Sequence, residues 1–488
     1  MVNPISLTTK IFTELNKTTS SLLPVAIKDS ADIVGRTTMA KQEGGKHEAR
    51  ERFIEETSTS LVWLGGIPLS RWLFDKAIIN PLGFDSKTNL ELFDKKKNKF
   101  QNLQDNFEKI KDVKLKDQNL ADLSKNLGNS INKEISILGK SINKYKALQV
   151  VKAVITTLVP MVLLSHTLVK MNFDLTDKIK KKELEEKYNK PEISQQAQNI
   201  QQPQNKKDLS FSSLKNFMVD AFSPVALATS ATNNPLANMG ALDLAISGGR
   251  IANARNTNEK IEYGIKEGGI IFFIYMGGKL IQDSLEWVIK QTKGLNVNLS
   301  PVLLDDKKEG GFLKKVEEMV KDPSKKAEWM NFDKKKEKEI LDTISTHLKG
   351  DKKEFANGEF VNPVLKAAQK TGLIKLLETA DGKFVLDPRK YIDTDKIAGL
   401  NKDIVAFTEN ASKNKASSLT DFFAQAKKIK RISLIANLMI CNLAVGYAVP
   451  KLQYMVREKR TGTKMAPGHE KYAKMEKELQ TISSYKTA

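Results

Sequence analysis

Residues 249–289 read GRIANARNTNEKIEYGIKEGGIIFFIYMGGKLIQDSLEWVI, and this stretch decides the fold because the chain contains it twice. The earlier copy, residues 35–77, reads GRTTMAKQEGGKHEARERFIEETSTSLVWLGGIPLSRWLFDKA. Gly35-Arg36 falls on Gly249-Arg250, and after an offset of two residues the pair Gly65-Gly66 falls on Gly277-Gly278. Matches that keep their order over about forty residues are typical of an internal repeat. We therefore predict two related halves, both mainly helical, by internal duplication.

The matched positions include two cations and an upstream aspartate in each copy. They are Asp29, Arg36 and Lys41 in the first copy and Asp243, Arg250 and Arg255 in the second. Near a bilayer the cations would contact the phosphates of acidic lipids, at about 1 kcal/mol per residue. The alternative is that they cap helices or form ion pairs with the two aspartates. The candidate lipid-binding residues are therefore Arg36, Lys41, Arg250 and Arg255.

The composition favours an anionic partner. The 488 residues include 79 Lys plus Arg against 58 Asp plus Glu, which gives a net charge of +21. Nucleic acid and acidic phospholipid are the two obvious partner classes. A single-strand binder needs arginines and aromatic residues interleaved as a stacking platform, and the chain has only 7% aromatic residues with no such stretch. Much of the charge can instead lie on solvated helix faces.

The cysteine count and the N-terminus bear on the compartment. The single cysteine, Cys441, allows no intrachain disulfide and no cysteine-based zinc site, which fits a reducing compartment. The N-terminus lacks a basic region followed by an unbroken apolar region, so we predict no cleavable signal peptide.

Two apolar segments near the ends of the two halves are candidate membrane spans. Residues 150–168 and 432–450 are each flanked by basic residues and approach the apolar character expected of a span. The alternative is that both helices form the buried core of a soluble bundle, with Lys152, Asn437 and Asn442 satisfied internally. A third apolar stretch, residues 61–79, is interrupted by glycines and a proline, so we expect it to be buried in the protein core.

We divide the chain into a first half at residues 1–190, a Gln/Asn-rich linker at 191–207 and a second half at 208–488. The second half carries a polar insertion at residues 305–420. Apolar residues at helical spacing predict helices at 312–320 and 337–347. Asn357-Gly358 and Asp381-Gly382 are turn signals before short apolar pieces, which predicts a small β-hairpin near residues 355–390.

No constellation of catalytic residues emerges. The chain lacks a phosphate-binding loop, a dinucleotide-binding glycine fingerprint and a nucleophile elbow. His47, Glu51 and Glu55 would share one helix face at the spacing of metal ligands, but the second copy has no such set. We interpret these three residues as part of a solvated charged face, and we predict no metal, no cofactor and no enzymatic activity.

These features favour a membrane-associated, non-enzymatic structural or scaffolding protein of the cell inner membrane. Its polar helical regions, residues 92–146 and 305–420, would face the cytoplasm and bind protein partners, while acidic lipids would be the anionic partner. One alternative is a soluble helical protein that binds nucleic acid non-specifically through its charge. Another is a transporter or membrane enzyme, although neither apolar segment carries an acidic residue.

Overall fold

The computed structural model describes residues 6–17, 21–82, 84, 144, 147–149, 151–152, 155–156, 164, 168–188, 235–305, 311–322, 337–349, 354–387, 392–413, 418–467 and 469–487. Of this part of the chain, 81% is helical and 4% is strand, which confirms a mainly helical protein. The linker at 191–207 lies outside the described residues, as do most of residues 92–146 and 150–168.

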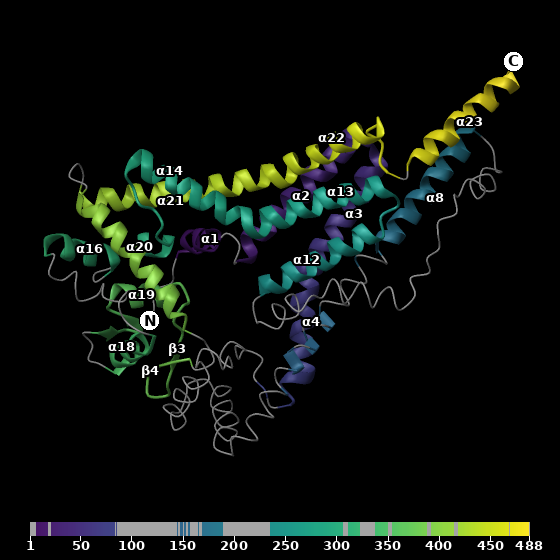
Figure 1. The fold of residues 1–488 in the computed structure, drawn as a ribbon. Helices are drawn as coiled ribbons and strands as arrows, with labels where there is room; N and C mark the ends of the chain where they lie inside the picture. The colour runs from purple at the N-terminus through teal and green to yellow at the C-terminus, as the bar shows by residue number, and fades with distance from the viewer. Residues whose placement is uncertain are drawn as a thin grey trace. The chain divides into compact units, whose positions relative to one another are not determined.

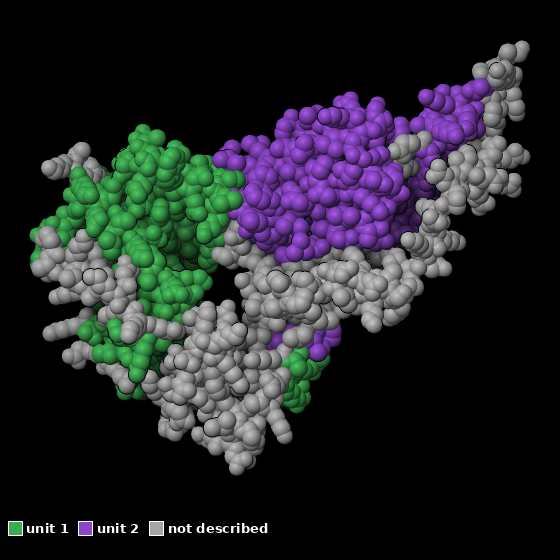
Figure 2. Space-filling view, in the orientation of Figure 1, with its two compact units in different colours: residues 1–24, 75–148, 279–438 green, residues 25–74, 149–278, 439–488 purple. Residues whose placement is uncertain are grey.

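The chain forms two compact units, which Figure 2 shows in green and purple. Unit 1 comprises Met1–Pro24, Asp75–Leu148 and Lys279–Leu438, and unit 2 comprises Val25–Phe74, Gln149–Gly278 and Met439–Ala488. Each unit therefore draws segments from both halves of the sequence. These units are defined by contacts in space, and the division into repeat halves stays a prediction.

Unit 2 is built from helices. They are α2 (Leu22–Glu43), α3 (Lys46–Leu61), α4 (Ile67–Phe74), α8 (Val169–Tyr188), α12 (Pro235–Ala252), α13 (Thr257–Ile271), α22 (Val449–Thr461) and α23 (Glu470–Thr487). Three π-helical segments continue some of these helices. Segment η1 (Val62–Gly66) joins α3 to α4, η6 (Phe272–Gly277) follows α13, and η8 (Ala444–Ala448) precedes α22. Helix α13 packs against both α12 and α22, α3 packs against α8, and α8 packs against α23 (Figure 1).

The two copies of the repeated stretch show the same order of elements. In the first copy, α2 ends at Glu43, just before Gly44-Gly45, and α3 then runs through η1 into α4. In the second copy, α12 ends at Ala252, Asn256 caps α13, and α13 runs through η6 into α14 (Gly278–Lys293). Each copy is thus a helix, a break, and a long helix with a π-segment at its glycine pair.

The predicted interruption at Gly65-Gly66 and Pro68 is wrong, because the helix continues through these residues. The N–H of Ile67 donates to the carbonyl of Val62, five residues back, in the wider π-helical turn. A proline inside an ordinary α-helix removes one hydrogen bond and contacts the preceding turn. The π-segment shifts the hydrogen-bonding pattern just before Pro68, so the chain stays helical. The same arrangement recurs at η8, where the N–H of Val449 bonds to Ala444 and Pro450 follows.

The expected burial of residues 61–79 is also wrong for most of the large side chains. Leu61, Leu69, Trp72 and Leu73 are exposed, and Phe74 is one of the few that are buried. The α3 part of this long helix turns its polar face toward the interior of unit 2, whereas α4 buries only Ile67 and Phe74 and leaves its other large apolar side chains exposed.

The longest helix combines α21 (Leu419–Leu443), η8 and α22. It extends over Leu419–Thr461 and is, among the described residues, the one helix long and apolar enough to cross a membrane. Only 33% of its most apolar 18-residue stretch is buried. The other predicted span, residues 150–168, lies largely outside the described part of the chain.

Cys441 lies on this helix and is fully buried in unit 2. We expect its thiol to react slowly with a maleimide in the native protein and rapidly after denaturation, because the reagent reaches it only when the helices separate. An exposed thiol introduced by Ser284→Cys is the matched control and should react at once in the native protein. Rapid labelling of Cys441 in the native chain would contradict this packing.

Unit 1 contains shorter helices and two hairpins. The helices are α1 (Leu7–Asn16), η2 (Asp75–Ile79), α14, α15 (Pro301–Leu304), α16 (Phe312–Lys321), α18 (Glu337–Lys349), α19 (Pro363–Lys370), α20 (Thr394–Lys413) and α21. The hairpins pair β1 (Phe355–Ala356) with β2 (Glu359–Phe360) and β3 (Leu376–Glu378) with β4 (Phe384–Leu386). Both predicted helices of the insertion and its predicted β-structure are confirmed. Asn357 and Gly358 form the first turn with positive φ angles of 53° and 78°.

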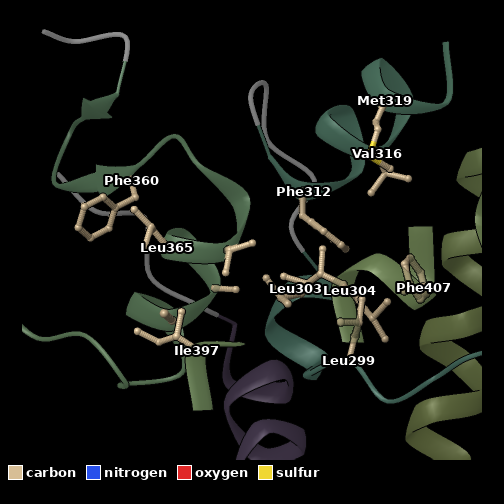
Figure 3. Close-up of a cluster of buried hydrophobic side chains, with 14 of the residues drawn as sticks. Leu299, Leu303, Leu304, Phe312, Val316, Met319, Phe360, Leu365, Ile397 and Phe407 are labelled. Carbon is tan, nitrogen blue, oxygen red and sulfur yellow. The ribbon is translucent and has the colours of Figure 1, made fainter. Parts of the chain in front are cut away.

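Unit 1 has an ordinary apolar core. Phe312 of α16 lies 6.0 Å from Phe407 of α20, and Phe407 lies 5.1 Å from Phe423 of α21, measured between ring centroids. Figure 3 shows part of this cluster, with Phe312 and Val316 on α16. Helices α16, α18, α19 and α20 of unit 1 therefore turn apolar side chains into a shared core, whereas α14 and α21 also expose large apolar side chains, among them Trp287 and Ile432.

Candidate functional site: a buried ion-pair network

The interior of unit 2 is filled with charged side chains. Helix α3 presents acidic and basic residues at spacings of three and four, which place them on one face of the helix. These buried residues are Glu48, Glu51, Arg52, Glu55 and Glu56. Helix α13 contributes a second charged face in the same way, with Glu259, Glu262, Lys266 and Glu267. Together with Asp32, Arg36, Arg250, Arg255 and Arg457, they form what we call the ion-pair network.

Arg457 of α22 joins the two charged faces. Its Nη2 lies 2.8 Å from Glu48 Oε1 and 2.5 Å from Glu262 Oε2, and its side chain is 0% exposed. Its Nε and Nη1 atoms donate to the second oxygens of Glu262 and Glu48 at 2.6 and 3.0 Å. Tyr454 donates a further hydrogen bond of 2.9 Å to Glu48. The planar guanidinium thus binds both carboxylates in bidentate fashion, the strongest form of such contacts.

Lys266 and Arg250 occupy the other end of the network. The Lys266 ammonium group lies 3.1 Å from Glu55 and 3.4 Å from Glu267, and it also contacts Glu56. Arg250 lies 3.0 Å from Glu55 and 2.7 Å from Glu267. A buried charge is costly unless it is paired and hydrogen-bonded. Helices α3, α12 and α13 are therefore tied together by shared carboxylates.

Neighbouring cations keep two of these carboxylates, Glu51 and Glu267, ionised. Burial opposes ionisation of Glu51, but His469 and Arg255 lower its pKa to about 2. Burial likewise opposes ionisation of Glu267, and Arg250 and Lys266 lower its pKa to about 2. Glu51 and Glu267 are therefore ionised at neutral pH, whereas burial raises the pKa of Asp32 to about 7 despite its contact with Arg36.

The structure places the four candidate lipid-binding residues differently. Arg36 is buried and lies 2.6 Å from Asp32, and Arg250 is buried against Glu55 and Glu267. Arg255 is mostly buried and lies 2.8 Å from Glu259, whereas Lys41 is exposed. The three arginines form ion pairs, as the alternative interpretation proposes, but their partners are Asp32, Glu55, Glu267 and Glu259 rather than Asp29 and Asp243. Lipid contact stays a prediction, and Lys41 is the residue whose exposure suits it.

His47, Glu51 and Glu55 do not form a solvated face. His47 lies 2.8 Å from Glu183 of α8, while Glu51 and Glu55 are buried in the ion-pair network. The interpretation of these glutamates as solvated is therefore wrong. Among the described residues, no group of three or more His, Cys, Asp and Glu side chains is arranged to hold a metal ion.

A buried lysine contacts the π-segment of the second copy. Lys28 of α2 donates hydrogen bonds to the carbonyls of Phe273 and Ile274 in η6, at 3.1 and 3.5 Å. A π-helical turn leaves carbonyls outside the regular α-helical pattern, so they can accept from a side chain. Burial lowers the pKa of Lys28. This contact fixes α2 against η6.

Reasoning from the sequence missed the network, although a signal was present. At the spacing that relates Arg36 to Arg250, Glu48 falls on Glu262 and Arg52 falls on Lys266. Charges that recur at matched positions are unusual for a solvated face, which tolerates any polar residue. Arg457 lies outside both copies, and nothing in the local sequence indicates its role.

Comparison of the chain with protein-family models, with curated proteins and with solved structures gives no match. The function must therefore be inferred from the geometry. Each arginine and lysine of the ion-pair network has a carboxylate partner, so the network's chemistry suits holding helices together rather than binding a charged ligand.

Proposed function

We propose that the protein is an integral membrane protein with a non-enzymatic structural role, anchored by the helix Leu419–Thr461. The observation that carries the proposal is the orientation of side chains on this helix. The exposed residues between positions 432 and 455 are apolar, and the partly exposed Lys451 side chain lies 2.8 Å from Glu43. The exposed residues are Ile432, Ile435, Met439, Ile440, Leu443, Tyr447, Ala448, Leu452 and Met455.

The buried face of the same helix carries polar side chains. Ser433, Asn437, Gln453 and Arg457 are all buried. Leu434, Val445 and Val449 are buried beside them, so apolar residues lie on both faces, whereas the exposed face of a surface helix in a soluble protein is polar. Residues 432–455 extend over about 36 Å at about 1.5 Å per residue, which exceeds a hydrocarbon core of about 30 Å. The outward face is therefore long enough to lie against lipid across a bilayer.

The exposed side chains of α4 support the same proposal. Leu69, Trp72 and Leu73 are about half exposed, and tryptophan is enriched where a membrane meets water. In the membrane proposal these side chains would also lie against lipid. The soluble alternative would leave the large apolar side chains of α4 and of the long helix exposed to water, and large exposed apolar patches mark interaction or membrane surfaces.

We further propose that the two copies of the repeated stretch arose by duplication. The shared order of helix, break and π-segment supports this, as do the recurring charges Glu48 and Glu262. The ion-pair network would then be the contact between the two copies, closed by Arg457. Unit 1, with its apolar core, would be the part available to protein partners.

Substitution on the exposed apolar face tests the membrane proposal. We expect Met439→Arg combined with Leu443→Arg to release the protein from carbonate-washed membranes, because each arginine costs about 2.5–3.5 kcal/mol in a membrane helix. Leu7→Arg is the matched control, since Leu7 is 74% exposed on α1 and Leu443 is 63% exposed. The control should stay in the membrane fraction. A wild-type chain extracted by carbonate would overturn the proposal.

Acidic lipid is the proposed anionic partner, and Lys41 is its most exposed candidate contact. Flotation of the protein with neutral and with acidic vesicles, across a salt series, measures this contribution. We expect Lys41→Gln to reduce the preference for acidic vesicles without reducing insertion into neutral ones. Tight, salt-dependent binding to DNA with no vesicle association would favour the nucleic-acid alternative.

A further inference from the structure

Two carboxyl groups in unit 2 differ from the members of the ion-pair network. Each acidic member of the network lies within 4.0 Å of at least one cation. Asp29 of α2 and Asp243 of α12 instead accept hydrogen bonds from hydroxyl groups. These two aspartates occupy matched positions, so each copy of the repeated stretch contains one carboxyl group that is hydrogen-bonded to a hydroxyl group in this way.

The hydroxyl donors are placed alike in the two copies. Tyr275 donates to Asp243 Oδ2 at 2.7 Å from 32 residues downstream. Ser60 donates to Asp29 from 31 residues downstream. Asp243 is only 7% exposed, so water does little to solvate its charge. A hydroxyl group can donate to a carboxylate and can equally accept from a carboxylic acid, which suits a group that changes its protonation.

The charges that face the two aspartates come from three helices. Glu56 of α3 lies near Asp29, and Glu267 of α13 lies near Asp243. Arg250 of α12 is near both aspartates, but its guanidinium group is bound to Glu55 and Glu267. The two aspartates also repel each other. The charge near the two aspartates is therefore mainly negative, because the guanidinium group of Arg250 is already paired with Glu55 and Glu267.

Burial and the nearby negative charges both favour the protonated, neutral form of each aspartate. Burial, together with Glu56, raises the pKa of Asp29 to about 6. Burial, together with Glu267 and Asp29, raises the pKa of Asp243 well above its usual range. Like-charged carboxyl groups that share a site cannot both ionise easily.

We propose that Asp29 and Asp243 form a proton-binding site inside unit 2, separate from the ion-pair network. Each carboxylate takes up one proton from water on an oxygen atom and releases it as the pH rises. The site uses one aspartate from each copy, and Ser60 and Tyr275 orient the two groups. It does not depend on membrane anchoring, so either proposal can fail alone.

The site makes the stability of unit 2 depend on pH in a defined direction. A carboxyl group with a raised pKa in the folded state binds its proton more tightly there than in the unfolded state. Its contribution to stability is therefore present at low pH and is lost as the pH rises through about 6. Glu51 and Glu267, whose pKa values are lowered to about 2, act in the opposite direction, because their contribution to stability is present at neutral pH and is lost at acidic pH.

Infrared spectroscopy of the full chain in detergent tests the site directly. At neutral pH we expect the carbonyl stretch of a protonated carboxylic acid. Asp243→Asn should reduce this signal. Asp29→Asn should remove the part of the signal that changes as the pH crosses about 6. Glu51→Gln is the matched control, because Glu51 is buried but ionised, and it should leave the signal unchanged. A signal that is missing in the wild type, or unaffected by either aspartate variant, would overturn the proposal.

Thermal unfolding followed by circular dichroism gives a second readout. We expect the double variant Asp29→Asn with Asp243→Asn to lose less of its melting temperature than the wild type when the pH is raised above 6, because asparagine resembles the neutral acid. Glu51→Gln should lower the melting temperature on both sides of pH 6. Equal destabilisation of the double variant at every pH would mean that the aspartates act as ionised structural groups.

Discussion

Replacing Arg457 by methionine will unfold unit 2. The substitution leaves Glu48 and Glu262 facing each other inside the protein without their cation. Removal of one partner from a buried ion pair typically costs about 3–5 kcal/mol, and Arg457 serves two carboxylates at once. We expect Cys441, which is buried in unit 2, to become reactive toward maleimide at a temperature at which the wild type is protected.

The control for Arg457→Met is Arg460→Met, one turn along the same helix, where the side chain is exposed. It should leave the protection of Cys441 almost unchanged, since exposed charges contribute about 1 kcal/mol or less. Adding Glu48→Gln and Glu262→Gln to Arg457→Met should restore part of the stability, because the unpaired charges are then gone. Unaltered protection of Cys441 in Arg457→Met alone would show that the two glutamates do not need this cation.

Replacing Gly35 by alanine will force α2 away from η8. A methyl group at Gly35 would lie only 2.0 Å from the carbonyl oxygen of Gly446, and backbone atoms cannot rotate aside. Overpacking of side chains commonly costs about 1–3 kcal/mol, and a clash with backbone should lie at or above the upper end. We expect early exposure of Cys441 in the same labelling experiment.

Gly264→Ala is the matched control for this substitution. Gly264 lies in helix α13, and a methyl group there would meet no atom within 4 Å. Alanine should stabilise that helix slightly, by about 0.5–1 kcal/mol. If Gly35→Ala were as harmless as Gly264→Ala, α2 and η8 could not approach as closely as they do.

Local signals in the sequence predicted the local structure well. The break between α2 and α3 falls at Gly44-Gly45, and the turn residues Asn357-Gly358 mark a hairpin. Helices α16 and α18 follow the spacing of their apolar residues because both helices bury their apolar faces in the core of unit 1. In each case, residues that are close together in the sequence determine the local structure.

The orientation of the helices in unit 2 could not be predicted in the same way. Residues 61–79 look like core because they are apolar, yet Leu61 and Trp72 are exposed. Glu51 and Glu55 look like surface because they are charged, yet they are buried. Helical periodicity separates the two faces of a helix, but it does not say which face points inward when the cations that neutralise the polar face lie far away in sequence.

The separation of Arg457 from its partners bears on the order in which the protein is made. A ribosome synthesises Glu48 and Glu262 long before the helix that carries Arg457. Until that helix arrives, the growing chain contains both carboxylates but lacks the cation that lies between them in unit 2. Assembly of this unit must therefore finish after translation has passed α22, and a nascent chain stalled earlier would need a chaperone or an insertase to shield its polar faces.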